Sequence, residues 1–115
     1  MLTEDQEAAK FHQWLVRKGL RYTHVANESR SGRYGMIRGA KLKGMGQSAG
    51  FPDFLVILPS EIGSRLLFIE LKRTRGSHTS KEQKNWLNDL DACAGVETAI
   101  CKGADAAIKF VEHRL

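Results

Sequence analysis

The spacing of apolar positions predicts a helix over residues 4–18. Apolar side chains recur every three or four residues, at Ala8, Phe11, Trp14 and Leu15, which is typical of one face of an amphipathic helix. Thr3 can cap the first turn, and Gly19 follows the last periodic position. This segment therefore has both a start signal and a stop signal.

Four short runs predict strands, at residues 21–26, 54–58, 66–72 and 96–101. The first is rich in β-branched and aromatic residues. The runs 54–58 and 66–72 are almost wholly apolar, which favours strands buried on both faces. Residues 59–65 between them have turn chemistry, so we expect these two strands to form a hairpin.

Three further helices complete the predicted fold. Ser80-Lys81-Glu82-Gln83 matches a capping box and predicts a helix to about Cys93 with Gly95 as its C-cap. Residues 104–111 predict a terminal helix, and residues 33–45 a weak one that its glycines loosen. The order α-β-α-β-β-α-β-α predicts an α/β fold, with residues 1–115 as a single domain and helices flanking a mixed central sheet.

Composition is that of an ordinary globular domain, with 42% hydrophobic and 27% charged residues. Cys93 and Cys101 have no metal-ligand spacing, so we expect buried, reduced thiols. No apolar stretch is long enough to span a bilayer, and the acidic, polar first residues do not resemble a secretory signal. These features predict a cytoplasmic location.

The net charge of +5 suggests a polyanionic partner. Basic residues gather in the segment 30–43, at Arg30, Arg33, Arg38, Lys41 and Lys43, and again at Lys72, Arg73 and Arg75. A solvated basic face would have the same composition. The position of both clusters beside the chemistry described next favours DNA binding.

Glu70 and Lys72 interrupt an apolar strand from the same face, because they are two residues apart. Burying such charges stabilises a fold poorly, although a simple ion pair at the strand end is the alternative. In a hairpin where paired residue numbers sum to about 124, Asp53 lies opposite Leu71 and diagonal to both charges. A slip of one residue, or a bulge, places it on their face.

Three charged groups at the end of two apolar strands suggest catalysis. The carboxylates of Asp53 and Glu70, with the Leu71 carbonyl and water, form an oxygen site suited to Mg²⁺ or Mn²⁺. Lys72 can position or activate a water molecule and offset charge that develops on a phosphate.

The order Pro52-Asp53, hydrophobic hairpin, Glu70-Leu71-Lys72 resembles the PD-(D/E)xK nuclease motif. Three further stretches extend the similarity to the VRR-NUC (virus-type replication-repair nuclease) family: Asn27-Glu28-Ser29-Arg30, the run from Gly44 to Pro52, and Ser80 to Leu87. The resemblance covers nearly the whole chain. It implies a restriction-endonuclease-like fold. It also implies that the protein acts in a bacterial or phage-infected cell.

The resemblance also implies roles for particular residues. Nucleases of this kind add a carboxylate from the first helix, for which Glu7 is favoured and Glu4 is the alternative; both could instead simply complement the helix dipole. Gln83 is expected to orient water or touch the phosphate, or to serve only in the capping box. Asn27 is expected to line the DNA cleft or close a turn.

The implied function is a metal-dependent DNA endonuclease, selective for branched substrates such as Holliday junctions and acting as a homodimer. A non-specific or flap-type nuclease would need the same site. A DNA-binding module without catalysis is the alternative from another class, and the complete Asp-Glu-Lys set argues against it.

Overall fold

A mixed four-stranded sheet organises this chain, whose computed structural model describes residues 1–25, 40–41 and 43–115. The strands lie in the order β1-β2-β3-β4; β1, β2 and β3 are antiparallel neighbours, and β4 runs parallel to β3. The elements are α1 (Glu4–Lys18), β1 (Arg21–His24), β2 (Phe54–Leu58), β3 (Arg65–Lys72), α3 (Lys81–Asp91), β4 (Val96–Lys102) and α4 (Ala104–Glu112). The predicted α/β class with a mixed sheet is confirmed.

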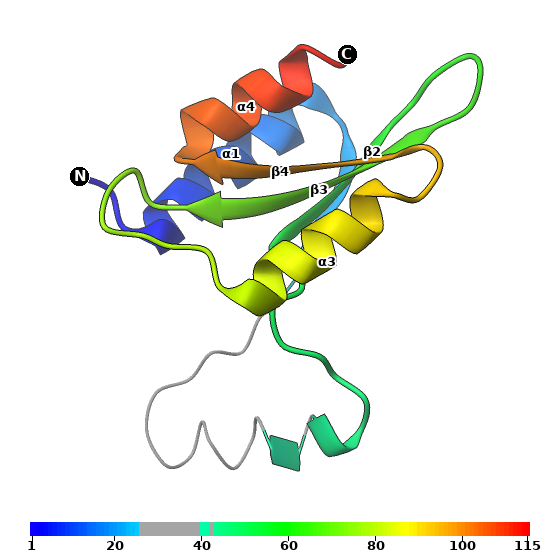
Figure 1. The fold of residues 1–115 in the computed structure, drawn as a ribbon. Coiled ribbons are helices and arrows are strands. Elements are labelled where there is room, and N and C mark those ends of the chain that lie inside the picture. Colours follow the sequence, from blue (N-terminus) through cyan, green and yellow to red (C-terminus); the bar gives the residue numbers. More distant parts are fainter. Residues whose placement is uncertain (26–39, 42) are drawn as a thin grey trace.

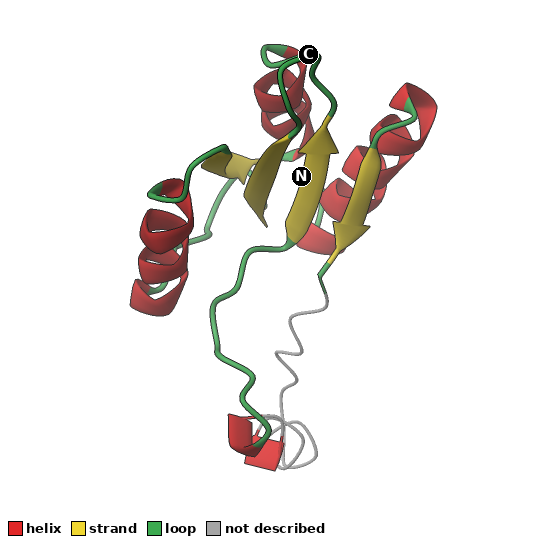
Figure 2. Ribbon diagram, turned by 90° about the vertical axis from the view of Figure 1, so that its right-hand side faces the viewer, coloured by secondary structure: helices red, strands yellow, loops and turns green. Residues whose placement is uncertain are grey.

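Helices cover both faces of the sheet: α1 and α4 lie on one side and α3 on the other (Figure 1, Figure 2). The main core lies under α1 and α4, where Phe11 packs edge-on against Phe54 with ring centroids 5.0 Å apart. On the α3 face of β2, Leu55 and Ile57 are only half-buried. The prediction of burial on both faces is therefore wrong for β2, because α3 covers only part of that face.

The helix start signals are confirmed. Thr3 and Ser80 each form a complete capping box, with Gln6 and Gln83 as their partners, and Gly19 ends α1 in the left-handed conformation. The predicted end of α3 is wrong: its C-cap is Ala92 rather than Gly95. Gly95, with φ of 75°, lies instead in the turn that leads into β4.

The hairpin register differs from the predicted one by a single residue. Phe54 pairs with Ile69 and Leu58 with Arg65, so paired numbers sum to 123 rather than about 124. The turn is thus centred between Glu61 and Ile62 instead of on Ile62. Continued by one residue, this register sets Asp53 opposite Glu70, which is the slip that brings the two carboxylates to one face.

Other predicted details differ at their ends. β1 ends at His24 rather than residue 26. Most of the predicted helix 33–45 lies outside the described residues; residues 40–41 and 43–44 are helical and stand apart from the sheet (Figure 1, Figure 2). Cys101 is buried as expected, whereas Cys93 is exposed, because it follows the last turn of α3. Within the described ranges, no helix has the length and apolar character to cross a membrane.

Candidate active site

Two charged side chains leave β3 on the face toward α3 and are almost fully buried. Glu70 is 1% exposed and Lys72 is 8% exposed. The Lys72 ammonium lies 3.3 Å from Glu70 Oε2. A buried ion pair of this kind contributes little net stability compared with apolar packing. Its presence beneath a helix is therefore not explained by the stability of the fold.

Gln83, in the first turn of α3, holds this pair in place. Its side-chain Nε2 donates to Glu70 Oε2 at 2.7 Å, while its Oε1 accepts from Lys72 Nζ at 3.1 Å. The same Oε1 accepts from the Ser80 backbone N–H at 2.9 Å, as the capping box requires. The capping-box role predicted for Gln83 therefore occurs, and the same side chain also contacts Lys72 and Glu70.

Asp53 reaches the same strand end from the segment before β2. Its Oδ2 accepts from the Leu71 backbone N–H at 2.8 Å, and its own carbonyl accepts from Val25 N–H at 2.6 Å. In a strand, the N–H and C=O of one residue point to the same edge. The Leu71 carbonyl therefore faces the side on which Asp53 lies.

The electrostatics of Glu70 mark this cluster as a charged site. Burial, with the nearby Asp53 carboxylate as the second cause, raises the pKa of Glu70 to about 7, against the lowering effect of Lys72. Among the described residues, Glu70 Oε1 is a buried side-chain oxygen without a hydrogen-bond partner. An unsatisfied buried oxygen is costly, and a cation would satisfy it.

The donor set suits a hard divalent cation. Carboxylate oxygens from Asp53 and Glu70 and a backbone carbonyl from Leu71 are the ligand types that Mg²⁺ and Mn²⁺ prefer. In the described part of the chain, no group of three His, Cys, Asp or Glu side chains is close enough to hold a metal.

The segment that carries Asp53 is locked onto α3 by close contacts. Trp86 Nε1 donates to the Ala49 carbonyl at 3.1 Å, and Phe51 lies edge-on to Trp86 and to Phe68. Gly50 has φ of 88°, and a Cβ there would lie 2.7 Å from the backbone of Glu82. The sequence around Gly50 carries no signal of this close approach to α3.

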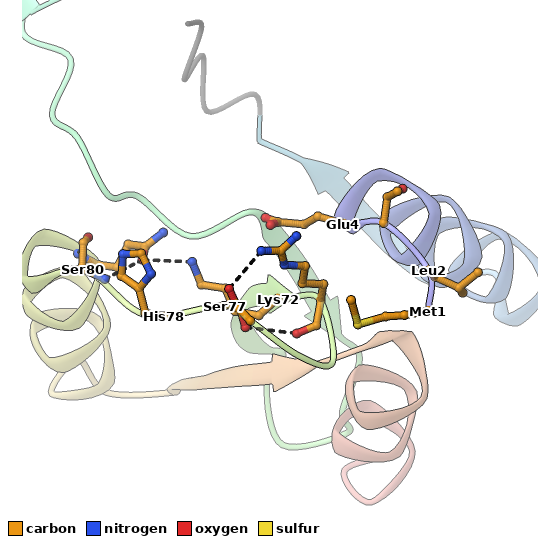
Figure 3. Close-up of a pocket in the computed structure, with 11 residues that line it drawn as sticks. Met1, Leu2, Glu4, Lys72, Ser77, His78 and Ser80 are labelled. Atoms are coloured by element: carbon orange, nitrogen blue, oxygen red, sulfur yellow. Dashed lines mark hydrogen bonds between the residues drawn. The ribbon is translucent and has the colours of Figure 1, made fainter.

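The two helix carboxylates differ in their surroundings. Glu7 is buried, and its Oε1 accepts from the Ala104 backbone N–H at 3.0 Å. It thereby caps α4, whose N-cap residue Gly103 has no side chain. Glu4 instead lines a pocket with Lys72 and Gln83 (Figure 3).

That pocket has a volume of about 480 Å³ and lies between the first four residues and the loop after β3. Figure 3 shows Ser77 and His78 on its loop side, with Met1 and Leu2 on the other. The sequence interpretation gave neither Ser77 nor His78 a role. Their only sequence signal is that they closely follow Lys72.

The predicted DNA-binding residues are only partly placed. Arg73 and Arg75 are exposed on the loop directly after Lys72, whereas Lys41 and Lys43 are exposed on the separate helical stretch. Asn27, Arg30, Arg33 and Arg38 lie outside the described residues. Of the basic residues that the structure describes, those that follow Lys72 in the chain lie near the site.

Comparison with known proteins agrees with this geometry. The VRR-NUC domain family matches residues 2–105. A solved structure titled "VRR_NUC domain protein" superimposes with a TM-score of 0.76, covering 98% of this chain and 88% of its own, at 24% sequence identity. No curated protein sequence matches the chain.

Proposed function

Because the chain belongs to the VRR-NUC domain family, we propose that it is a metal-dependent DNA endonuclease. In this proposal, Asp53, Glu70 and Lys72 form the active site that hydrolyses phosphodiester bonds of DNA. Family membership supports a nuclease-type function. The observation that carries the proposal is the buried Glu70 carboxylate, which shares its face with Asp53 and has an oxygen that no described residue hydrogen-bonds.

Asp53, Glu70 and the Leu71 carbonyl would hold Mg²⁺ or Mn²⁺. Such an ion, when bound, polarises a phosphate oxygen and makes a neighbouring water molecule more acidic. The ionised form of Glu70 is the one that binds a cation, so metal affinity should rise with pH through the Glu70 pKa of about 7.

Lys72 would act on the phosphate that is cut. Its ammonium can orient the attacking water and offset the negative charge that builds on the phosphoryl oxygens. Gln83 keeps the ammonium in place, since its Oε1 is fixed by the helix cap as well as by Lys72. A positioned donor of this kind contributes to the rate without having to reorganise.

The proposed nuclease site is also expected to include a carboxylate from α1. Glu7 is the residue that we favoured from sequence, but its Oε1 already accepts from Ala104. Glu4 lies on the wall of the pocket that contains Lys72. We therefore propose that Glu4, rather than Glu7, is the α1 carboxylate that takes part. Comparing Glu4→Gln with Glu7→Gln tests this choice.

The basic residues would hold the DNA backbone. Arg73 and Arg75 follow Lys72 directly, and Asn27, Arg30, Arg33, Arg38, Lys41 and Lys43 are proposed as further contacts. Phosphate contacts give affinity without reading sequence. Neutralising Arg33 and Arg38 together should weaken binding to all sequences alike and reduce its salt dependence.

We further propose selectivity for branched DNA, such as a Holliday junction, by a homodimer in the cytoplasm. The test is a cleavage panel of four-way junction, flap, splayed and linear duplex DNA in Mg²⁺ or Mn²⁺, with light scattering at the same protein concentration. Preferred junction cleavage by a dimer is the expected result. Equal cleavage of all substrates by a monomer would leave a general or flap-type nuclease, and tight binding without cleavage would leave a DNA-binding module.

A further inference from the structure

The pocket beside Lys72 has walls of two kinds. The loop after β3 supplies hydrogen-bonding groups from Arg73, Ser77 and His78. The start of the chain supplies the apolar side chains of Met1 and Leu2, together with the Glu4 carboxylate. Figure 3 shows Lys72 between these two walls. A ligand that suits both walls has a charged end and a flat apolar part.

Hydrogen bonds within the loop hold the loop wall in its conformation. Arg73 Nη2 donates to the Gly76 carbonyl at 2.9 Å, and Ser77 Oγ donates to the Arg73 carbonyl at 3.1 Å. Gly76 has φ of 71°, and a Cβ there would lie 3.3 Å from Arg73 Nη2. The loop is thus folded around its own arginine, whose guanidinium has five N–H donors and keeps others for a ligand.

The size of the pocket limits what can enter. About 480 Å³ lies within the usual range of about 300–1,000 Å³ for pockets that enclose a small molecule. This volume is large enough for one nucleotide that has left the base stack. Enzymes that act on DNA do draw single nucleotides into such pockets.

From these features we propose that the pocket receives one unpaired nucleotide next to the phosphate that is cut. Arg73 and Ser77 contact its phosphate, and its base lies between the His78 imidazole and the apolar wall of Met1 and Leu2. Imidazole rings and apolar side chains are suitable surfaces for an unstacked base. This inference rests on the proposed nuclease function, because Lys72 defines which phosphate is cut.

The consequence is a physical basis for substrate choice within a single protomer. Taking a nucleotide out of an intact duplex costs a few kcal/mol, and the cost is least where the nucleotide is already unpaired. Flaps, junctions and mismatches would therefore be cut faster than perfect duplex. This selectivity does not depend on how two protomers are arranged.

The test first maps the cut in a flap substrate and then places 2-aminopurine, a base whose fluorescence rises on unstacking, at each nucleotide beside it in a linear duplex. Binding is followed in Ca²⁺, which we expect to support binding with little cleavage. The variant is Ser77→Ala combined with His78→Ala. The matched control changes the same residue types away from the pocket, Ser60→Ala with His113→Ala.

Wild type and control should raise the fluorescence at one position about threefold or more, and the Ser77/His78 variant should not. A mismatch at that position should speed cleavage by wild type and have little effect for the variant. Cleavage of DNA without unstacking at any flanking position would overturn the inference and leave the nuclease function standing. A wild-type protein that cuts no DNA would overturn both.

Discussion

Gln83 Nε2 donates to Glu70 Oε2 across 2.7 Å, so the first turn of α3 is joined directly to the charged end of β3. Its Oε1 accepts from both Ser80 and Lys72. A residue that caps a helix therefore also orients both members of a buried ion pair. The position of α3 on the sheet and the geometry of the site depend on the same side chain.

Gln83→Glu should impair the site while keeping the cap. The new carboxylate can still accept from Ser80 and Lys72, but it cannot donate to Glu70 and adds a like charge beside it. We expect cleavage to fall by about tenfold or more with helix content unchanged by circular dichroism. Gln6→Glu is the matched control, since Gln6 has the same place in the capping box of α1 and, among the described residues, hydrogen-bonds Thr3 rather than a buried carboxylate. Equal losses in the two variants would contradict this role.

The stability of the metal-free protein should depend on Glu70. Because the pKa of Glu70 is raised to about 7, the folded chain binds its proton more tightly than the unfolded chain does. The contribution of Glu70 to the unfolding free energy in EDTA should therefore be fully present below its unfolded pKa and be lost as pH rises through about 7, a change of up to about 3 kcal/mol.

Urea unfolding at about pH 5 and about pH 8 measures this difference. Glu70→Gln should remove most of it, and Mg²⁺ in place of EDTA should restore the stability of the wild type at the higher pH. A wild-type unfolding free energy that rises over this range and is unaffected by Glu70→Gln would show that the Glu70 carboxyl is not held as described.

Gly50→Ala should be strongly destabilising. The added Cβ would meet the backbone of α3 at 2.7 Å, in addition to the cost of φ at 88°. Gly95→Ala separates these effects, because Gly95 also has positive φ, 75°, but nothing within 4 Å of a Cβ. Gly95→Ala should cost about 1 kcal/mol and Gly50→Ala about 3 kcal/mol or more in urea unfolding. Similar values for the two would mean that the loop is not pressed against α3.

Substitutions of the two α1 carboxylates should affect different properties of the protein. Glu7→Gln weakens the bond to Ala104 at the start of α4 and should lower the unfolding free energy by about 1 kcal/mol. Glu4→Gln should leave stability nearly unchanged and reduce metal affinity or cleavage, measured by calorimetry and by initial rates. If Glu7→Gln instead reduces metal affinity without loss of stability, the assignment is reversed.

Local signals in the sequence were sufficient for most of the fold. Capping boxes at Thr3 and Ser80 and alternating or continuous apolar runs depend on neighbouring residues, so both helix starts and the strands of the sheet could be predicted. The hairpin register was wrong by one residue, because a turn such as residues 59–64 can be closed with several centres. That single step decides whether Asp53 faces Glu70.

The site could be predicted only where charge conflicts with burial. Glu70 and Lys72 stand out because an apolar strand gives them no reason to be there. The capping of α4 by Glu7 joins residues far apart in the chain, and no local pattern reports it. The same holds for Gly50 against α3 and for the pocket between the chain start and the loop after β3, which arise only from tertiary packing.

The central claim is that Asp53, Glu70 and Lys72 together cut DNA, and the most direct measurement is cleavage of junction and flap DNA by matched variants in Mg²⁺ or Mn²⁺. Asp53→Asn, Glu70→Gln and Lys72→Ala should each reduce the rate by about 100-fold or more and leave DNA binding in place. Lys102→Ala is the control, because Lys102 pairs with Lys72 across the sheet but is exposed, and it should cut like wild type. Near wild-type cleavage by any of the three site variants would contradict the account.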